Sequence, residues 1–248
     1  MNLLVVGAGD VGRWVGRTVD ADVAFADADP ATAREAASAL DARAVALDAD
    51  RTFDAVCFAV PMSVVEDAVA EHAGRADRAV FDVTGSMRAP VAALRDHAPA
   101  LERVSLHPLF APDAAPGNVA VVPDAPGPTV DAILEDVGDA GNELVETTPD
   151  EHDDAMAAVQ AGAHAAILAY AMQAADVPER FGTPVSRGLD ELASRVLDGD
   201  PGLYADIQAT FDGADAVAAA ATDVAEADRA AFADLYREAS DRWRDRDG

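Results

Sequence analysis

The sequence contains no lysine and a single cysteine, Cys57, in 248 residues. One cysteine excludes a disulfide framework and a cysteine-rich metal site, and it favours a cytoplasmic protein. All 18 basic residues are arginine against 46 acidic residues, which gives a net charge of −28 at pH 7. Because so acidic a surface repels nucleic acid and anionic membranes, we expect neither as a partner.

Long apolar runs are also missing. No stretch approaches the ~20 residues of a membrane span, and Met1 leads into Leu3–Val6 without the basic flank of a signal peptide. The acidic residues are scattered along the chain. At 1 M salt a Debye length of ~3 Å screens their repulsion, while the carboxylates keep the surface hydrated. We therefore expect a halophilic protein whose folding depends on molar salt.

Short apolar runs alternate with helix-like segments over the first 147 residues, which is typical of a parallel sheet with crossover helices. We expect strands at Asn2–Val6, Asp22–Ala26, Arg43–Ala46, Ala55–Ala59, Arg78–Val83, Arg103–Leu106, Val119–Val122 and Glu143–Glu146. The helix-like segments between them include Val11–Val19, Pro30–Leu40, Met62–His72 and Thr129–Ala140.

The pattern changes where Thr148, Pro149 and Glu151 form the signature of a capped helix start. Only helical segments follow, many of them rich in alanine. The sequence thus predicts an α/β fold, in which an N-terminal Rossmann dinucleotide-binding domain, residues 1–147, precedes an all-α C-terminal domain, residues 148–248.

Glycines mark the first turn of the predicted sheet. Gly7, Gly9 and Gly12 follow a strand and open a helix that begins with Asp10 and Val11, where backbone can approach a pyrophosphate. Asp27 ends the second predicted strand, where its carboxylate would bind ribose hydroxyls and repel a 2′-phosphate. We therefore expect NAD as the cofactor. The plain alternative is a glycine-rich turn beside an unrelated surface aspartate.

Three other strand ends carry candidate groups. Val60 and Pro61 end the fourth strand, where they would contact the cofactor or simply close the strand. Ser86 follows the fifth strand and would bind a substrate hydroxyl, cap the helix beginning at Met87, or both. His107 ends the sixth strand on the ligand-binding edge, where its imidazole can accept a proton, although such a histidine is often structural.

The first helix of the second domain carries Gln160 and His164 on one face. From the residues alone, His164 is more simply a core histidine with satisfied hydrogen bonds. His152 lies twelve residues before His164. At about 100° per residue this places it about 120° around the helix from His164. We expect it to be an exposed first-turn residue. No spacing of histidine, cysteine or carboxylate indicates a metal site.

Together these segments resemble prephenate dehydrogenase. The resemblance is carried by five segments in order, Gly7–Gly12, Asp82–Ser86, His107–Pro112, Thr148–His164 and Asp200–Ile207. It implies that His107 deprotonates the C4 hydroxyl of prephenate, that Ser86 positions that hydroxyl, and that Arg195 binds the substrate carboxylate. It also implies a substrate role for His164 beside Gln160, and a homodimer formed through the helical domain.

The resemblance leaves alternatives open. Arginine stands at position 88, where relatives often have lysine, and alanine at 161, where some have a second histidine. Arogenate, whose side chain carries an amine, would undergo the same chemistry. Dehydrogenases of the β-hydroxyacid or imine-reducing type usually rely on a lysine that this chain lacks. The alternative outside catalysis is an NAD-sensing module that regulates a partner.

Overall fold

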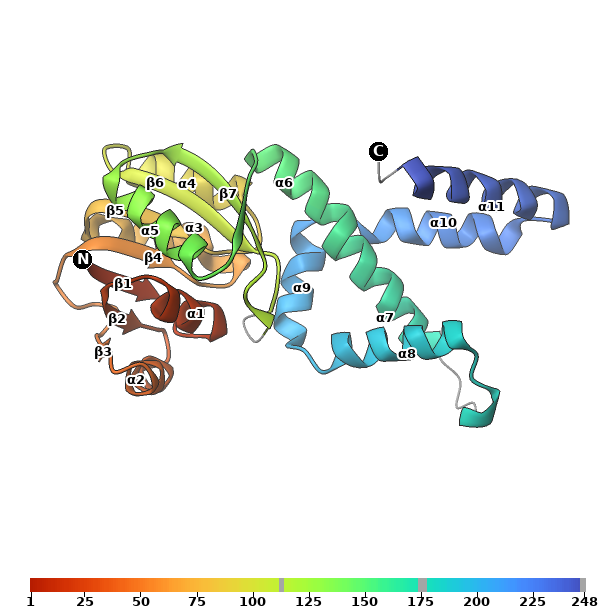
Figure 1. The fold of residues 1–248 in the computed structure, drawn as a ribbon, viewed down its shortest axis with the longest axis horizontal. Helices are drawn as coiled ribbons and strands as arrows, with labels where there is room; N and C mark the ends of the chain where they lie inside the picture. The colour runs from red at the N-terminus through yellow and green to blue at the C-terminus, as the bar shows by residue number, and fades with distance from the viewer. Residues whose placement is uncertain (112–113, 174–177, 246–248) are drawn as a thin grey trace. The chain divides into compact units, whose positions relative to one another are not determined.

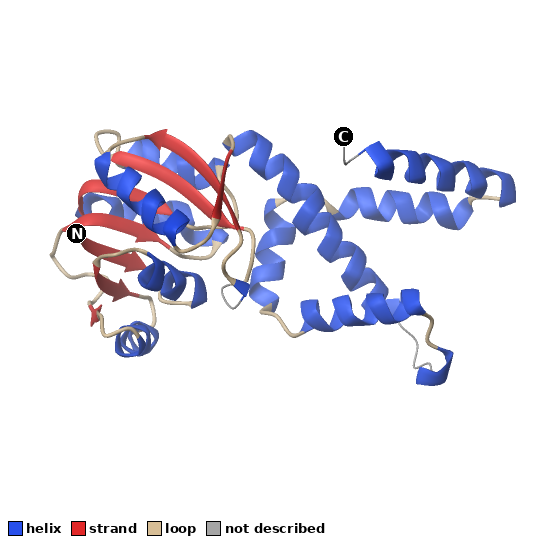
Figure 2. Ribbon diagram, in the orientation of Figure 1, coloured by secondary structure: helices blue, strands red, loops and turns tan. Residues whose placement is uncertain are grey.

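A computed structural model describes residues 1–111, 114–173 and 178–245. The chain divides into two compact units, Met1–Met156 and Ala157–Gly248. The first contains all the strands described, and the described part of the second is helical (Figure 2). The α/β class and the all-helical second half are therefore as predicted.

The first unit is built on one eight-stranded sheet with the order β3-β2-β1-β4-β5-β6-β7-β8 (Figure 1). Parallel strands in this order place the carboxyl ends of β1, β4, β5 and β6 at one edge. The strands are β1 Asn2–Val6, β2 Asp22–Ala26, β3 Arg43–Ala44, β4 Phe53–Phe58, β5 Ala76–Asp82, β6 Glu102–Pro108, β7 Asn118–Ala125 and β8 Glu143–Glu146.

One pairing departs from the predicted parallel sheet. β7 runs antiparallel to β6, with His107 opposite Ala120, whereas β7 and β8 are parallel. Only nine residues separate Pro108 from Asn118 in the sequence. A parallel return needs a crossover of a dozen or more residues, so a connection this short requires the strand to reverse.

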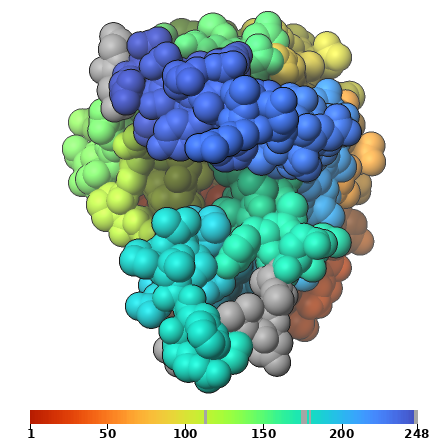
Figure 3. Space-filling model, turned by 90° about the vertical axis from the view of Figure 1, so that its right-hand side faces the viewer, coloured from red at the N-terminus to blue at the C-terminus, as the bar shows by residue number. Residues whose placement is uncertain are grey.

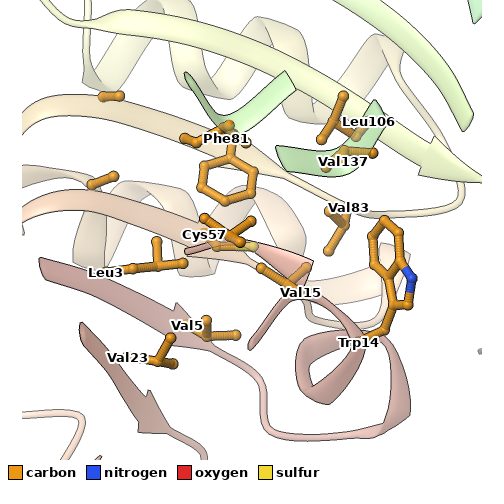
Figure 4. Close-up of a cluster of buried hydrophobic side chains, with 14 of the residues drawn as sticks. Leu3, Val5, Trp14, Val15, Val23, Cys57, Phe81, Val83, Leu106 and Val137 are labelled. Carbon is orange, nitrogen blue, oxygen red and sulfur yellow. The ribbon is translucent and has the colours of Figure 1, made fainter. Parts of the chain in front are cut away.

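Alternation along the strands covers both faces of the sheet with apolar side chains. Leu3 and Val5 of β1 belong to one buried cluster, which includes side chains of α1 Asp10–Thr18, α2 Pro30–Ala39 and α5 Pro128–Asp139 (Figure 4). The intervening residues of β1 point to the opposite face. They pack there in a second cluster, against α3 Val65–His72 and α4 Arg88–His97.

A long helix leads from the first unit into the second. Its first part is α6 Pro149–Met156, followed by a π-helical segment Ala157–Gly162 and by α7 Ala163–Gln173. By length and by a mean hydropathy of 1.3 over its most apolar window, this helix is apolar enough to cross a membrane, which the sequence reading missed. Many of its apolar residues are alanine, and by itself the pattern is weak evidence for a membrane span.

The remaining helices of the second unit begin at side-chain caps in three of four cases. Thr183 forms a capping box with Ser186, and Asp200 and Asp228 accept bonds from backbone N–H groups two or three residues ahead. The helices are α8 Pro184–Leu197, α9 Pro201–Thr210, α10 Ala214–Glu226 and α11 Arg229–Arg244.

Candidate active site

The glycine turn after β1 is shaped by two close approaches. Gly7 has a φ of +98°, and a Cβ there would lie 2.1 Å from the carbonyl oxygen of Ala59. A Cβ at Gly12 would lie equally close to the carbonyl oxygen of Gly7. Both positions exclude any side chain, because backbone atoms already occupy that space. Gly7 therefore lets the turn lie close to the end of β4, and Gly12 lets α1 lie close to the turn.

Gly9 has no such structural requirement. Its φ of −70° and ψ of −169° suit any residue, and among the described residues no atom lies within 4 Å of a Cβ placed there. No described side chain caps the helix that begins at Asp10, so its first N–H groups stay available. Open space beside free N–H groups and the positive end of a helix fits the pyrophosphate of a dinucleotide.

Asp27 lies directly against this turn. Its Oδ2 accepts a hydrogen bond of 2.8 Å from the Ala8 N–H, and its Oδ1 accepts one of 2.9 Å from the Asp29 N–H. The carboxylate thus belongs to the turn and is not an unrelated surface group. Val60 also lies beside the turn, with its Cγ1 3.3 Å from a Cβ built at Gly7. Pro61 follows it and precedes a short 3-10 turn, Met62–Val64.

The loop after β5 buries Ser86 without using it as a helix cap. The hydroxyl of Thr84 lies 2.7 Å from Asp82 Oδ1 and 3.0 Å from the Ser86 carbonyl oxygen. Asp82 is fully buried, and this burial raises its pKa to about 7. α4 begins two residues after Ser86, with no side-chain cap from its N-cap residue. The expectation that Ser86 caps this helix is therefore wrong.

The cap of α4 comes instead from α6. Asp153 accepts a 2.9 Å bond from the Met87 N–H on Oδ1 and a 3.0 Å bond from the Arg88 N–H on Oδ2. The Arg88 side chain also pairs with α6, through Asp150 at 2.6 Å and Asp154 at 2.7 Å. These ion pairs raise the pKa of Arg88. α4 and α6 are thus joined in two ways. The Asp153 carboxylate of α6 caps the start of α4, and the Arg88 guanidinium of α4 pairs with carboxylates of α6.

His107 is joined to the same carboxylate. Its Nδ1 lies 2.8 Å from Nε2 of His152, whose Nδ1 lies 2.7 Å from Asp153 Oδ1. His152 is only 3% exposed, so the expectation of an exposed first-turn residue is wrong. The Thr148 cap fixes where α6 begins, since its hydroxyl accepts the Glu151 N–H, but packing against α4 turns His152 inward.

Burial governs the charges in this group. Burial and the neighbouring His152 lower the pKa of His107 to about 3, so its ring is neutral at ordinary pH. Burial works to raise the pKa of Asp153. Hydrogen bonds from His152 and from the backbone N–H groups of Arg88 and Met87 hold it below its ordinary value. The site therefore pairs an ionised carboxylate with a neutral imidazole next to the end of β6.

The substrate-binding candidates Gln160, His164 and Arg195 lie in the second unit. His164 packs edge-on against Tyr204, with 4.9 Å between ring centroids, and burial lowers its pKa. Its Nδ1 and the Gln160 Oε1 are buried with no hydrogen-bond partner among the described residues. Such atoms cost about 1–3 kcal/mol each when left unpaired. This makes both side chains available to a polar ligand. Arg195 is exposed on α8.

Comparison with known proteins identifies the relatives of this chain. A family model described as prephenate dehydrogenase, nucleotide-binding domain, matches residues 13–122, a range that includes Ser86 and His107. The chain is 35% identical over 234 residues to 4-amino-4-deoxyprephenate dehydrogenase of Streptomyces pristinaespiralis, covering 86% of this chain and 78% of the relative. The chain belongs to the prephenate dehydrogenase family.

Solved structures share the fold of this family member over its whole length. Prephenate dehydrogenase of Aquifex aeolicus, solved with hydroxyphenyl propionate and NAD+, superposes with a TM-score of 0.73 at 16% identity, covering 99% of this chain and 98% of that one. Arogenate dehydrogenase of Synechocystis gives 0.64 at 17% identity, covering 100% and 99%. The predicted family, fold class and NAD-dependent oxidoreductase class are confirmed.

Proposed function

We propose that the chain oxidises prephenate to 4-hydroxyphenylpyruvate with release of carbon dioxide, using NAD+ as the hydride acceptor. The observation that carries this proposal is His107, a buried neutral imidazole at the carboxyl end of β6, held by His152 and Asp153. A neutral imidazole is the form that accepts a proton from an alcohol as the alcohol is oxidised.

Each predicted residue has a task in this reaction. The turn at Gly7–Gly12 would hold the NAD+ pyrophosphate, and Asp27 the adenosine ribose, where its carboxylate disfavours a 2′-phosphate. NAD+ supplies the acceptor for the hydride leaving C4. His107 takes the proton of the C4 hydroxyl, which Ser86 positions. Arg195 would bind the carboxylate through its forked guanidinium, with His164 and Gln160 as further polar contacts.

A second candidate substrate is 4-amino-4-deoxyprephenate, favoured by the name of the Streptomyces relative. Its amine replaces the C4 hydroxyl, and a neutral His107 can accept a hydrogen bond from either group. Arogenate is the third, supported by the fold shared with the Synechocystis enzyme. Initial rates of NADH formation at 340 nm with the three compounds rank them. A kcat/KM for prephenate well below that for either amine would overturn the main proposal.

We also propose that the chain forms a homodimer through its second unit. Exposed large apolar side chains gather there, including Met172, 81% exposed, and Val185, 74% exposed. α7, α10 and α11 bury none of their residues among the described part of the chain, and Figures 1 and 3 show α10 and α11 side by side. Apolar surface of this extent is typical of an interface.

Sedimentation equilibrium in molar KCl tests the dimer. We expect a mass twice the 25.6 kDa of one chain at micromolar concentration. A Met172→Glu, Val185→Glu double variant should shift the mass toward that of one chain, because two charges would be buried at the interface. A single-chain mass for the unmodified protein at all concentrations would contradict the proposal.

The surface charge supports a halophilic enzyme, and the single cysteine supports a cytoplasmic one. Because 46 acidic residues repel one another at low ionic strength, we expect the melting temperature to rise by several degrees or more from dilute buffer to 2 M KCl. Thermal unfolding followed by circular dichroism measures it. Sodium sulfate at matched ionic strength is the comparison for general salting-out. A melting temperature that does not rise with KCl would refute the adaptation.

A further inference from the structure

We propose that the positive charge created when His107 takes the substrate proton comes to rest on His152, which Asp153 holds in place. His107, His152 and Asp153 form one hydrogen-bonded row, with heavy-atom distances of 2.8 and 2.7 Å. This inference rests on the proposed oxidation and assigns His152 and Asp153 as positioning residues. Neither was expected from the sequence to take part in the reaction.

The row sets the tautomer of each ring. An ionised carboxylate only accepts hydrogen bonds, so His152 must present a proton from Nδ1 to Asp153 Oδ1. In the neutral form of His152 the lone pair lies at Nε2, and His107 then donates to it from Nδ1. The lone pair of His107 is therefore left at Nε2. Asp153 itself is fixed by two backbone N–H groups at the start of α4.

A proton can be passed along this row from His107 to His152 while the hydrogen bonds outside the two rings stay as they are. The C4 hydroxyl gives its proton to His107 Nε2, and the Nδ1 proton of His107 passes to His152 Nε2. His107 is neutral again, and His152 becomes an imidazolium paired with Asp153. When carbon dioxide leaves, its bonding electron pair enters the ring, and the proton returns by the same path to the phenolate oxygen. No further oxidant or reductant is needed.

Electrostatics favour the charge at His152 over His107. Burial holds the pKa of His107 at about 3, so an imidazolium there is costly. At His152 the positive charge lies 2.7 Å from the Asp153 carboxylate. Among the described residues, the other titratable groups facing this carboxylate are Arg88, whose Nη1 is 4.0 Å from Oδ2, and the buried Asp82.

Replacing His152 with glutamine separates alignment from proton uptake. The glutamine amide oxygen can still accept the bond from His107 Nδ1, but it cannot take a proton. We expect kcat to fall by roughly 10²-fold or more, as for a lost acid–base group, with KM and NAD+ affinity within twofold. His97→Gln, the same change at an exposed position on α4, should keep wild-type kcat. A His152→Gln enzyme with wild-type kcat would overturn the proposal.

A measurement without turnover keeps this inference separate from the proposed function. Long-range ¹H–¹⁵N spectra report the tautomer of each of the five histidines in the wild-type protein. We expect the Nδ1–H form for both His107 and His152. On acidification, the His107 ring should stay uncharged down to about pH 3. An Nε2–H tautomer at His107 refutes the row, whatever substrate the enzyme uses.

Discussion

Replacing His107 with asparagine lowers kcat by roughly 10²- to 10⁴-fold, the range expected for loss of a general base. The physical reason is that the asparagine amide is not basic at any ordinary pH and cannot accept the C4 hydroxyl proton. NAD+ affinity should be unchanged, because the glycine turn that holds the cofactor lies after β1 and His107 lies on β6. Rates of NADH formation give kcat, and protein fluorescence gives the affinity.

The matched control is His97→Asn, since His97 is exposed at the end of α4, away from the row. It should keep the wild-type kcat and melting temperature. A His107→Asn enzyme whose kcat stays within threefold of the wild type would show that another group accepts the proton. A reduced kcat with an equal loss of NAD+ affinity would point to a role in cofactor binding.

The second large effect is expected at Gly9. Valine should fold there without strain, since the backbone conformation is extended and the Cβ meets open space among the described residues. The side chain would nevertheless fill the space where the pyrophosphate approaches the first N–H groups of α1. Loss of one charged hydrogen bond, worth ~1.5–3 kcal/mol, weakens NAD+ binding by roughly 10- to 100-fold. Isothermal titration measures it.

Gly74 provides a control with the same open surroundings. A Cβ there also meets no described atom within 4 Å, but Gly74 lies in the turn before β5, at the opposite edge of the sheet. Gly74→Val should leave NAD+ affinity unchanged. If Gly9→Val folds and binds NAD+ as the wild type does, the pyrophosphate does not lie where the turn predicts.

The sequence determined most of the first unit because its signals are local. Asn2–Val6, Asp22–Ala26 and Glu143–Glu146 have the predicted bounds. In each of these strands a short apolar run is bounded by polar residues or glycine. The antiparallel direction of β7 follows from the short connection between β6 and β7. The alternation of residues along a strand does not show in which direction the strand runs, so the pattern alone did not predict it. Gly7, Gly9 and Gly12 were recognisable, although only coordinates distinguish close backbone approach from open space.

The missed residues of the site depend on contacts between distant segments. His107 and His152 are 45 positions apart, and the cap of Asp153 on α4 spans 66. The helical position of His152 was predictable from Thr148, whereas the side that would be buried depended on α4 packing against α6. One signal was available: a histidine followed directly by aspartate, four residues after the helix cap, can pair a base with a carboxylate.

The most direct test of the central claim is the absorbance at 340 nm of purified protein with NAD+ and prephenate in molar KCl. We expect NADH and 4-hydroxyphenylpyruvate in equal amounts. The rate should be lower with NADP+, because Asp27 lies against the turn where a 2′-phosphate would be repelled. No NADH from prephenate, arogenate or 4-amino-4-deoxyprephenate, in protein shown to be folded and to bind NAD+, would contradict the enzyme assignment and favour an NAD-sensing role.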